Sequence, residues 1–90
     1  MGLDQYAMAN GEDFFTWRNC GDIQGFMEDL YFERGGEGDS EGLFNNEEVV
    51  LTLEDIDALE AQEWFDDPEF CSAARWEFEH GAVVVYRSWW

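Results

Sequence analysis

The spacing of apolar and polar residues predicts one well-defined helix in the N-terminal half of the chain. Its apolar residues recur three or four positions apart and form one stripe, made of Ile23, Phe26, Met27, Leu30 and Tyr31. The acidic residues of this segment take the opposite side. Gly35 and Gly36 end the helix, and Arg34 lies in its last turn, where a cation suits the helix dipole.

A second helix is predicted over residues 53–65. Thr52 with Asp55 three residues later is a capping-box-like start for this helix. The residues predicted to face the core are Leu53, Ile56 and Leu59, and those predicted to face solvent are Glu54, Asp55 and Asp57.

The segment 69–80 fits two structures. Apolar residues four positions apart, including Phe70 and Phe78, predict a helix that Pro68 opens. The alternation of Trp76, Phe78 and His80 also fits a strand that turns back after His80. We favour the helix.

Three segments fit strands. Residues 3–8 alternate loosely and are broken at 11–13, residues 49–51 form a short β-branched run, and residues 82–89 are predicted to lie in the middle of the sheet. The order is β-α-β-α-α-β. The chain is therefore predicted to be a single acidic α+β domain over 1–90, with a small single-layer mixed or antiparallel sheet of about three strands and two or three helices on one face.

Charge changes this picture most. The chain has 22 Asp and Glu, four Arg and no Lys, so its formal net charge is −18. Solubility of a small domain needs a net charge of only roughly 2–8, so the excess indicates a basic partner, bound cations or a high-salt setting. Aromatic residues are 18% of the chain, a fraction that disordered acidic segments lack.

The acidity also excludes classes of partner. Four Arg cannot provide the basic footprint that nucleic acids or anionic membranes require, so we expect neither direct nucleic-acid binding nor membrane binding. No apolar run approaches the roughly 20 residues of a membrane span. The N-terminus lacks the basic region and apolar run of a signal peptide, which predicts an intracellular protein.

The acids are unevenly distributed. Thirteen of them and no Arg fall within residues 35–69, whereas the four Arg lie outside that window. A loop and a helix in this window are therefore predicted to form an acidic surface. Adaptation to high salt would spread the acids evenly, so the clustering weighs against it. The acids predicted to bind a partner are Glu37, Asp39, Glu41, Glu47, Glu48, Glu54, Asp55, Asp57, Glu60, Glu63, Asp66 and Asp67.

The loop over 37–48 partly matches a calcium-binding EF-hand loop. Glu37, Asp39, Glu41 and Glu48 fall at ligand positions, with a glycine at the turn position. Position one is normally Asp, however, and the exit segment is a predicted strand where an EF-hand needs a helix. Calcium binding by these four residues is therefore an alternative, and no other cofactor is predicted.

No arrangement of residues indicates an enzyme. Carboxylate pairs are too abundant to be informative, and His80 has no evident nucleophile partner in the sequence. Cys20 and Cys71 are predicted to be buried, inert thiols, because acids lie near both and no CxxC motif occurs. No catalytic residue is predicted.

The C-terminal pair Trp89 and Trp90 is the least expected aromatic feature, because chain ends seldom hide two indole rings. Either the two rings pack back on the first helix, or they form a homodimer or partner contact, where Trp is enriched.

Several segments resemble a family of small bacteriophage proteins. The family begins MGLD-x-Y, carries a YWRK-like motif followed by Asn, Ile-His and an aromatic residue, and ends in a strand with Tyr, Ser and Trp. The matching segments here are MGLDQY at 1–6, FTWRN at 15–19, FME at 26–28 and VYRSWW at 85–90. Asn19 replaces the family's Lys, and Gln24 replaces its His. The resemblance implies a phage origin and location in the host cytoplasm, without implying a mechanism.

Phage origin and dense negative charge together predict an acidic inhibitor that binds a basic, nucleic-acid-handling host protein. Such a protein has a basic groove for DNA, and carboxylates can occupy that groove in place of phosphates. The targets would be defence complexes, a host polymerase or a nucleoid protein. The alternatives are a phage accessory or structural protein without DNA mimicry, and the calcium-binding protein.

Overall fold

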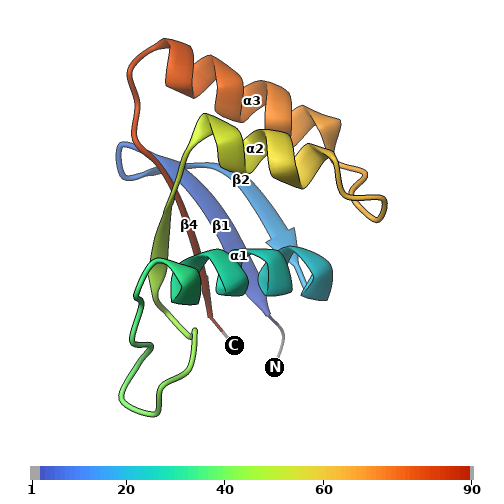
Figure 1. Cartoon of the computed structure of the whole chain (residues 1–90). Helices are drawn as coiled ribbons and strands as arrows, with labels where there is room; N and C mark the ends of the chain where they lie inside the picture. The colour runs from blue at the N-terminus through green and yellow to red at the C-terminus, as the bar shows by residue number, and fades with distance from the viewer. Residues whose placement is uncertain (1–2, 90) are drawn as a thin grey trace.

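The computed structural model describes residues 3–89, which contain four strands and three helices (Figure 1). Along the chain these elements are β1 (Asp4–Ala9), β2 (Glu12–Arg18), α1 (Gly21–Glu33), β3 (Glu48–Leu51), α2 (Leu53–Glu60), α3 (Pro68–Glu79) and β4 (Val84–Trp89). None of the helices in the described part is long and apolar enough to cross a membrane.

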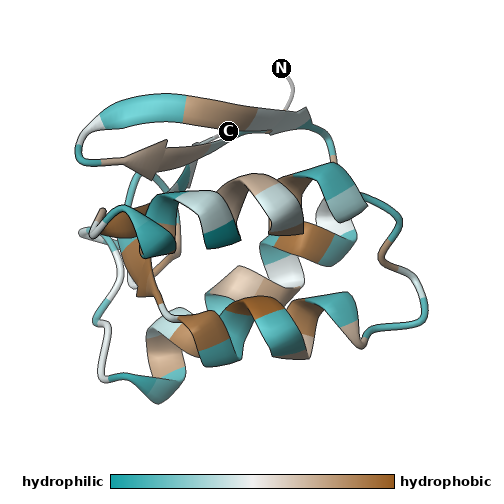
Figure 2. Cartoon of the chain, turned by 90° about the horizontal axis from the view of Figure 1, so that it is seen from above, coloured by the Kyte–Doolittle hydropathy of each residue, from teal (hydrophilic) through white to brown (hydrophobic). Residues whose placement is uncertain are grey.

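The four strands form one antiparallel sheet in the order β2-β1-β4-β3. All three helices lie on one side of this sheet (Figure 2). The predicted α+β class, with helices on one face and the last strand inside the sheet, is confirmed. The sheet has four strands rather than about three, since β2 adds an edge.

Strand β2 was not predicted, because residues 11–13 looked like a break. The structure places Asn10 and Gly11 in a two-residue hairpin turn, with φ angles of 52° and 86°. Both central residues of a type I′ turn need positive φ, and Asn-Gly is its preferred sequence. The sequence therefore contained the signal for this hairpin.

Helices α1 and α3 confirm the predictions from apolar spacing. Ile23 and Met27 of α1 are buried, as are Phe70 and Ala74 of α3. The alternative strand over 69–80 is wrong, because the helix continues to Glu79 and only then ends, at His80.

Helix α2 is shorter than predicted. The capping box of Thr52 and Asp55 is present, but the helix ends at Glu60 instead of 65. The chain then turns, which brings Trp64 against Phe26 of α1 with ring centroids 6.5 Å apart. Leu53 is exposed rather than inward-facing, since the buried side of this short helix consists of Asp55, Ile56 and Leu59.

An aromatic cluster fixes α3 against the β1–β2 hairpin. The ring of Phe70 lies 4.8 Å from Trp17, 5.4 Å from Phe15 and 6.0 Å from Phe14, measured between centroids. Phe70 itself is fully buried. Stacked and edge-to-face aromatic pairs of this kind add about 0.5–1.5 kcal/mol each beyond the burial of their area. This cluster joins the unpredicted strand β2 to α3.

A buried polar network joins the middle of the sheet to α1. The buried Gln5 side chain donates to the Tyr86 hydroxyl and to the Cys20 carbonyl, both at 2.9 Å, and accepts from the Cys20 amide at 2.8 Å. The Tyr86 hydroxyl in turn donates to Gln24 at 2.7 Å. Burial raises the pKa of Tyr86 to about 12. Gln5 therefore satisfies the backbone groups of the residue that precedes α1.

Candidate interaction surfaces

The acids are segregated by the layers of the fold. Four of the 22 lie in strands, namely Asp4, Glu12, Asp13 and Glu48, and the other eighteen lie in the helices and the loops. The helices cover one side of the sheet only (Figure 2). We call the helices α1–α3 with residues 34–47 and 61–67 the helical layer. The predicted acidic window forms most of it, and the acids of α1 join it in space.

Two of the predicted partner-binding acids are engaged by Arg75 of α3. Its guanidinium contacts Asp57 at 2.7 Å and Glu60 at 2.9 Å, which ties α2 to α3. The hydrogen bond from Arg75 lowers the pKa of the Glu60 carboxyl, and both acids raise the pKa of Arg75. These carboxylates remain exposed, but part of their charge is neutralised locally.

Three others support the fold. Asp55 is buried, which corrects the prediction that it faces solvent, and it pairs with Arg34 at 2.5 Å. Asp67 accepts a hydrogen bond from the Trp17 indole at 3.1 Å, and Glu47 accepts one from the Tyr31 hydroxyl at 2.9 Å. Asp55 in particular cannot reach a partner without local unfolding.

Six of the predicted acids remain fully available; one of them, Glu48, lies in β3 and points away from the helices, and the other five lie in the helical layer. All six are exposed and make no side-chain hydrogen bond or ion pair with any of residues 3–89; the five in the helical layer are Glu37, Glu41, Glu54, Glu63 and Asp66. The sequence-based choice missed five more that meet the same criteria in the helical layer, namely Asp22, Asp29, Glu33, Glu69 and Glu79. These five acids lie on the polar sides of α1 and α3, and that position in the sequence pattern could have placed them among the predicted partner-binding acids.

The loop over 37–48 is organised by its own contacts. Asp39 accepts hydrogen bonds from the amides of Glu41 at 2.8 Å and Leu43 at 3.1 Å, so it closes a turn. Glu48 belongs to β3 and is exposed there. Among the described residues no group of three or more His, Cys, Asp or Glu side chains could hold a metal ion. The calcium alternative, with Glu37, Asp39, Glu41 and Glu48 as ligands, gains no support from this geometry.

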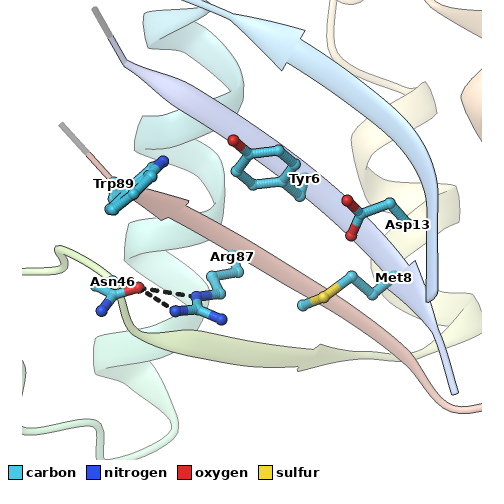
Figure 3. Close-up of a pocket in the computed structure, with 6 residues that line it drawn as sticks. All are labelled: Tyr6, Met8, Asp13, Asn46, Arg87 and Trp89. Carbon is cyan, nitrogen blue, oxygen red and sulfur yellow. Dashed lines mark hydrogen bonds between the residues drawn. The ribbon is translucent and has the colours of Figure 1, made fainter. Parts of the chain in front are cut away.

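The opposite side of the sheet is a second surface, which we call the open face. Its side chains come from alternate strand positions, including Asp4, Tyr6 and Met8 of β1, because Gln5, Ala7 and Ala9 are buried beneath the helices. An open hollow of about 320 Å³ lies on it, lined by Tyr6, Met8, Asp13, Asn46, Arg87 and Trp89 (Figure 3).

Two features of the open face distinguish it from the helical layer. The Arg87 guanidinium hydrogen-bonds Asn46, and it forms no ion pair with the carboxylates of residues 3–89 (Figure 3). Trp89, one of the two predicted contact aromatics, is 52% exposed beside it. Trp90, the other, lies outside the described residues. Trp89 therefore does not pack back on the first helix.

The thiol of Cys71 is fully buried in α3, as predicted, whereas Cys20 is partly exposed before α1. Burial raises the pKa of Cys71 from its ordinary 9.0 to about 11. His80 stacks on Trp76, with ring centroids 3.8 Å apart. The absence of enzymatic activity stays a prediction.

The raised pKa of Cys71 predicts where alkaline destabilisation begins. The unfolded thiol ionises near pH 9 and the folded thiol only near pH 11, so rising pH favours the unfolded chain across that interval. We expect a loss of about 2–3 kcal/mol in the free energy of unfolding between these limits. Urea titrations at pH 8 to 11 measure it. In Cys71→Ala the loss of stability should start about one pH unit higher, where the hydroxyl of Tyr86 begins to ionise in the unfolded chain. An unchanged onset would contradict the assignment of the first loss of stability to Cys71.

Comparisons with known proteins add no family to this picture. No protein-family model matches the chain, and neither curated proteins nor solved structures give a match.

Proposed function

We propose that this protein is a phage-encoded inhibitor that binds a basic, nucleic-acid-handling host protein through its helical layer. The single observation that carries the proposal is the segregation of charge. Eighteen of the 22 acids lie in the helices and loops that form this layer, and its two arginines, Arg34 and Arg75, are already paired with acids. Dense negative potential on one side speeds association with a basic groove and suppresses other partners.

The internal contacts refine which acids would act. Asp55 serves the fold, and Arg75 partly neutralises Asp57 and Glu60. The available acids are therefore those of the loop at 37–41, the outer side of α2 and the turn at 63–66, joined by the exposed acids of α1. The host cytoplasm is the compartment where such a target would be met. A homodimer formed through Trp89 would leave both helical layers free.

The experiment is affinity capture of host proteins at 0.05 and 0.5 M NaCl, followed by competition with duplex DNA. We expect a basic protein that is captured at low salt, is lost at high salt, and is displaced by DNA. A partner that DNA does not displace would favour the accessory-protein alternative. Capture of no host protein at low salt would contradict both the inhibitor proposal and the accessory-protein alternative.

Matched variants separate a local surface from net charge. Glu54→Gln, Glu63→Gln and Asp66→Asn together remove three charges from the helical layer, and Glu12→Gln, Asp13→Asn and Glu48→Gln remove three from the strands. Exposed ion pairs contribute about 0.2–1 kcal/mol each, so the first triple variant should weaken affinity about tenfold. The second should change it less than twofold. Equal losses would show that only total charge matters.

A further inference from the structure

The open face has a charge balance unlike the rest of the molecule. Asp4, Asp13 and Glu48 carry three negative charges on it, and Arg18 and Arg87 carry two positive ones, so its net charge is −1 out of −18 for the chain. Exposed apolar side chains accompany these charges, Trp89 at 52% and Val50 at 56%. Of the two sides of the sheet, this is the one on which a second copy would meet little repulsion.

The edges of the sheet are less suited to association than its face. At the β3 edge, Arg34 reaches over from the end of α1 and donates to the carbonyl of Val50 at 2.7 Å. At the β2 edge, Glu12, Asp13 and Arg18 are charged and exposed. The pairing of β2 with β1 is also irregular there, with a register shift between Ala7 and Met8. Charged and bulged edges resist the addition of another strand. A dimer formed by pairing edge strands is therefore disfavoured, and the open face is the better site for association.

We infer that the open face binds the open face of a second copy, as a two-fold symmetric homodimer. The positions of charge favour this occupant. In the register of the sheet, Trp89 and Arg18 both pair with Asp4, from opposite sides of β1. Arg87 pairs with Tyr6 on one side, and Asp13 pairs with Met8 on the other.

A two-fold axis along β1 places β4 of each copy opposite β2 of the other. Trp89 then lies opposite Arg18 of the other copy, and Arg87 lies opposite Thr16, one residue pair along β2 from Asp13, twice over. Asp4 faces its own counterpart, and each Asp4 is paired with Arg18 of its own copy at 3.7 Å. The Trp89–Arg18 pairing is a cation–π contact between copies, and Arg87 reaches diagonally toward the Asp13 carboxylate. Tyr6 and Met8 meet their own counterparts near the axis. Packed sheets lie about 10 Å apart, which leaves room for these side chains.

The size of the face sets the strength of the dimer. The three strands that overlap, β2, β1 and β4, lie about 4.8 Å apart and are about six residues long at about 3.3 Å per residue, so they span roughly 300 Å² of flat area per copy. A standard interface buries about 800 Å² per partner, so this dimer belongs to the weak class, with an expected Kd of about 10–100 μM. The two helical layers end up on opposite outer sides and still repel one another.

That repulsion gives the dimer a distinctive response to salt. Screening of the helical layers should lower the dimer Kd at least threefold between 0.05 and 0.5 M NaCl. Binding of a basic protein to the helical layer should weaken over the same range. The inference does not rest on the proposed inhibitor function, and the opposite salt responses keep the failure of one distinguishable from the failure of the other.

Sedimentation equilibrium of the whole chain, from 5 μM to 1 mM, tests the inference with matched variants. Trp89→Ala should raise the dimer Kd at least tenfold, whereas Trp76→Ala, at an equally exposed tryptophan (55%) on α3, should change it less than twofold. Met8→Glu adds a charge to β1 beside the axis and should also raise Kd at least tenfold. Leu53→Glu adds the same charge on α2, at a residue 49% exposed, and should leave Kd within threefold.

Circular dichroism of each variant establishes that the fold is kept, and any variant that loses it is replaced by Tyr6→Glu, also on the open face. A chain that stays monomeric at 1 mM in 0.5 M NaCl overturns the inference. So does a dimer that Trp89→Ala and Met8→Glu leave intact, or one that Leu53→Glu weakens as strongly as Met8→Glu.

Discussion

Replacing Phe70 with alanine is expected to lower the free energy of unfolding by about 3–5 kcal/mol, the usual cost of removing a buried aromatic ring. The ring is fully buried and touches Phe14, Phe15 and Trp17, all from β2. Its loss opens a cavity that those three rings, held by the strand, can fill only in part. Domains of this size have about 5–15 kcal/mol of stability in total, so the variant should be close to unfolded in mild urea.

Urea titration with tryptophan fluorescence measures this change, and Trp17 reports on it directly because its ring lies 4.8 Å from Phe70. Phe32→Ala is the control. Phe32 is 40% exposed and stacks edge-on against Tyr31, so its removal should cost less than about 1 kcal/mol. Equal losses for the two variants would mean that the Phe70 cluster does not hold the hairpin to the helices.

The cluster also explains what could be predicted from the sequence. Phe70 takes its place in an apolar spacing of four, and that spacing predicts α3. Its partners lie more than 50 residues earlier, in a strand that the local pattern hid behind Gly11 and two acids. Helical periodicity is a local property, whereas the placement of an edge strand depends on contacts with distant residues. Only the Asn-Gly turn offered a local clue to β2.

The acidic surface, like the fold, could be predicted from the sequence only in part. The run of acids over 35–69 is visible in the sequence, and it does form much of the helical layer. Which carboxylates are free is not visible there, because the arginines that engage them come from α3 and from the end of α1, 15–21 residues away. The near-neutral open face was not predicted either, since it arises only when four strands bring Arg18 and Arg87 to one side.

Removing the carboxylate of Asp55 is the second large effect that we expect, about 2–3 kcal/mol lost from the free energy of unfolding. Asp55 accepts from the Thr52 amide at 2.8 Å, as half of the capping box, and pairs with Arg34 at 2.5 Å. A cap contributes about 1 kcal/mol, and a hydrogen bond to a charged group about 1.5–3 kcal/mol. Arg34 is partly exposed and can regain water, which keeps the sum toward the lower end.

Asp55→Ala and its neighbour Glu54→Ala make a matched pair, because both remove one acid from the first turn of α2. Because Glu54 is exposed, Glu54→Ala should lower the free energy of unfolding by less than about 0.5 kcal/mol in urea titrations. A double-mutant cycle with Arg34→Ala isolates the ion pair, for which we expect a coupling of about 1–2 kcal/mol. Similar losses for Asp55→Ala and Glu54→Ala would contradict the structural role.

The same pair separates fold from binding within one turn of helix. Because Asp55 is buried, Asp55→Asn should leave affinity for a basic partner within twofold in chains that remain folded. Glu54→Gln should weaken that affinity severalfold without changing stability, since its carboxylate is exposed and makes no ion pair within residues 3–89. Titrating both variants against a captured partner at low salt measures this. If Asp55→Asn weakened binding more than Glu54→Gln, the buried Asp55 would have to contact the partner, which would contradict binding through exposed carboxylates.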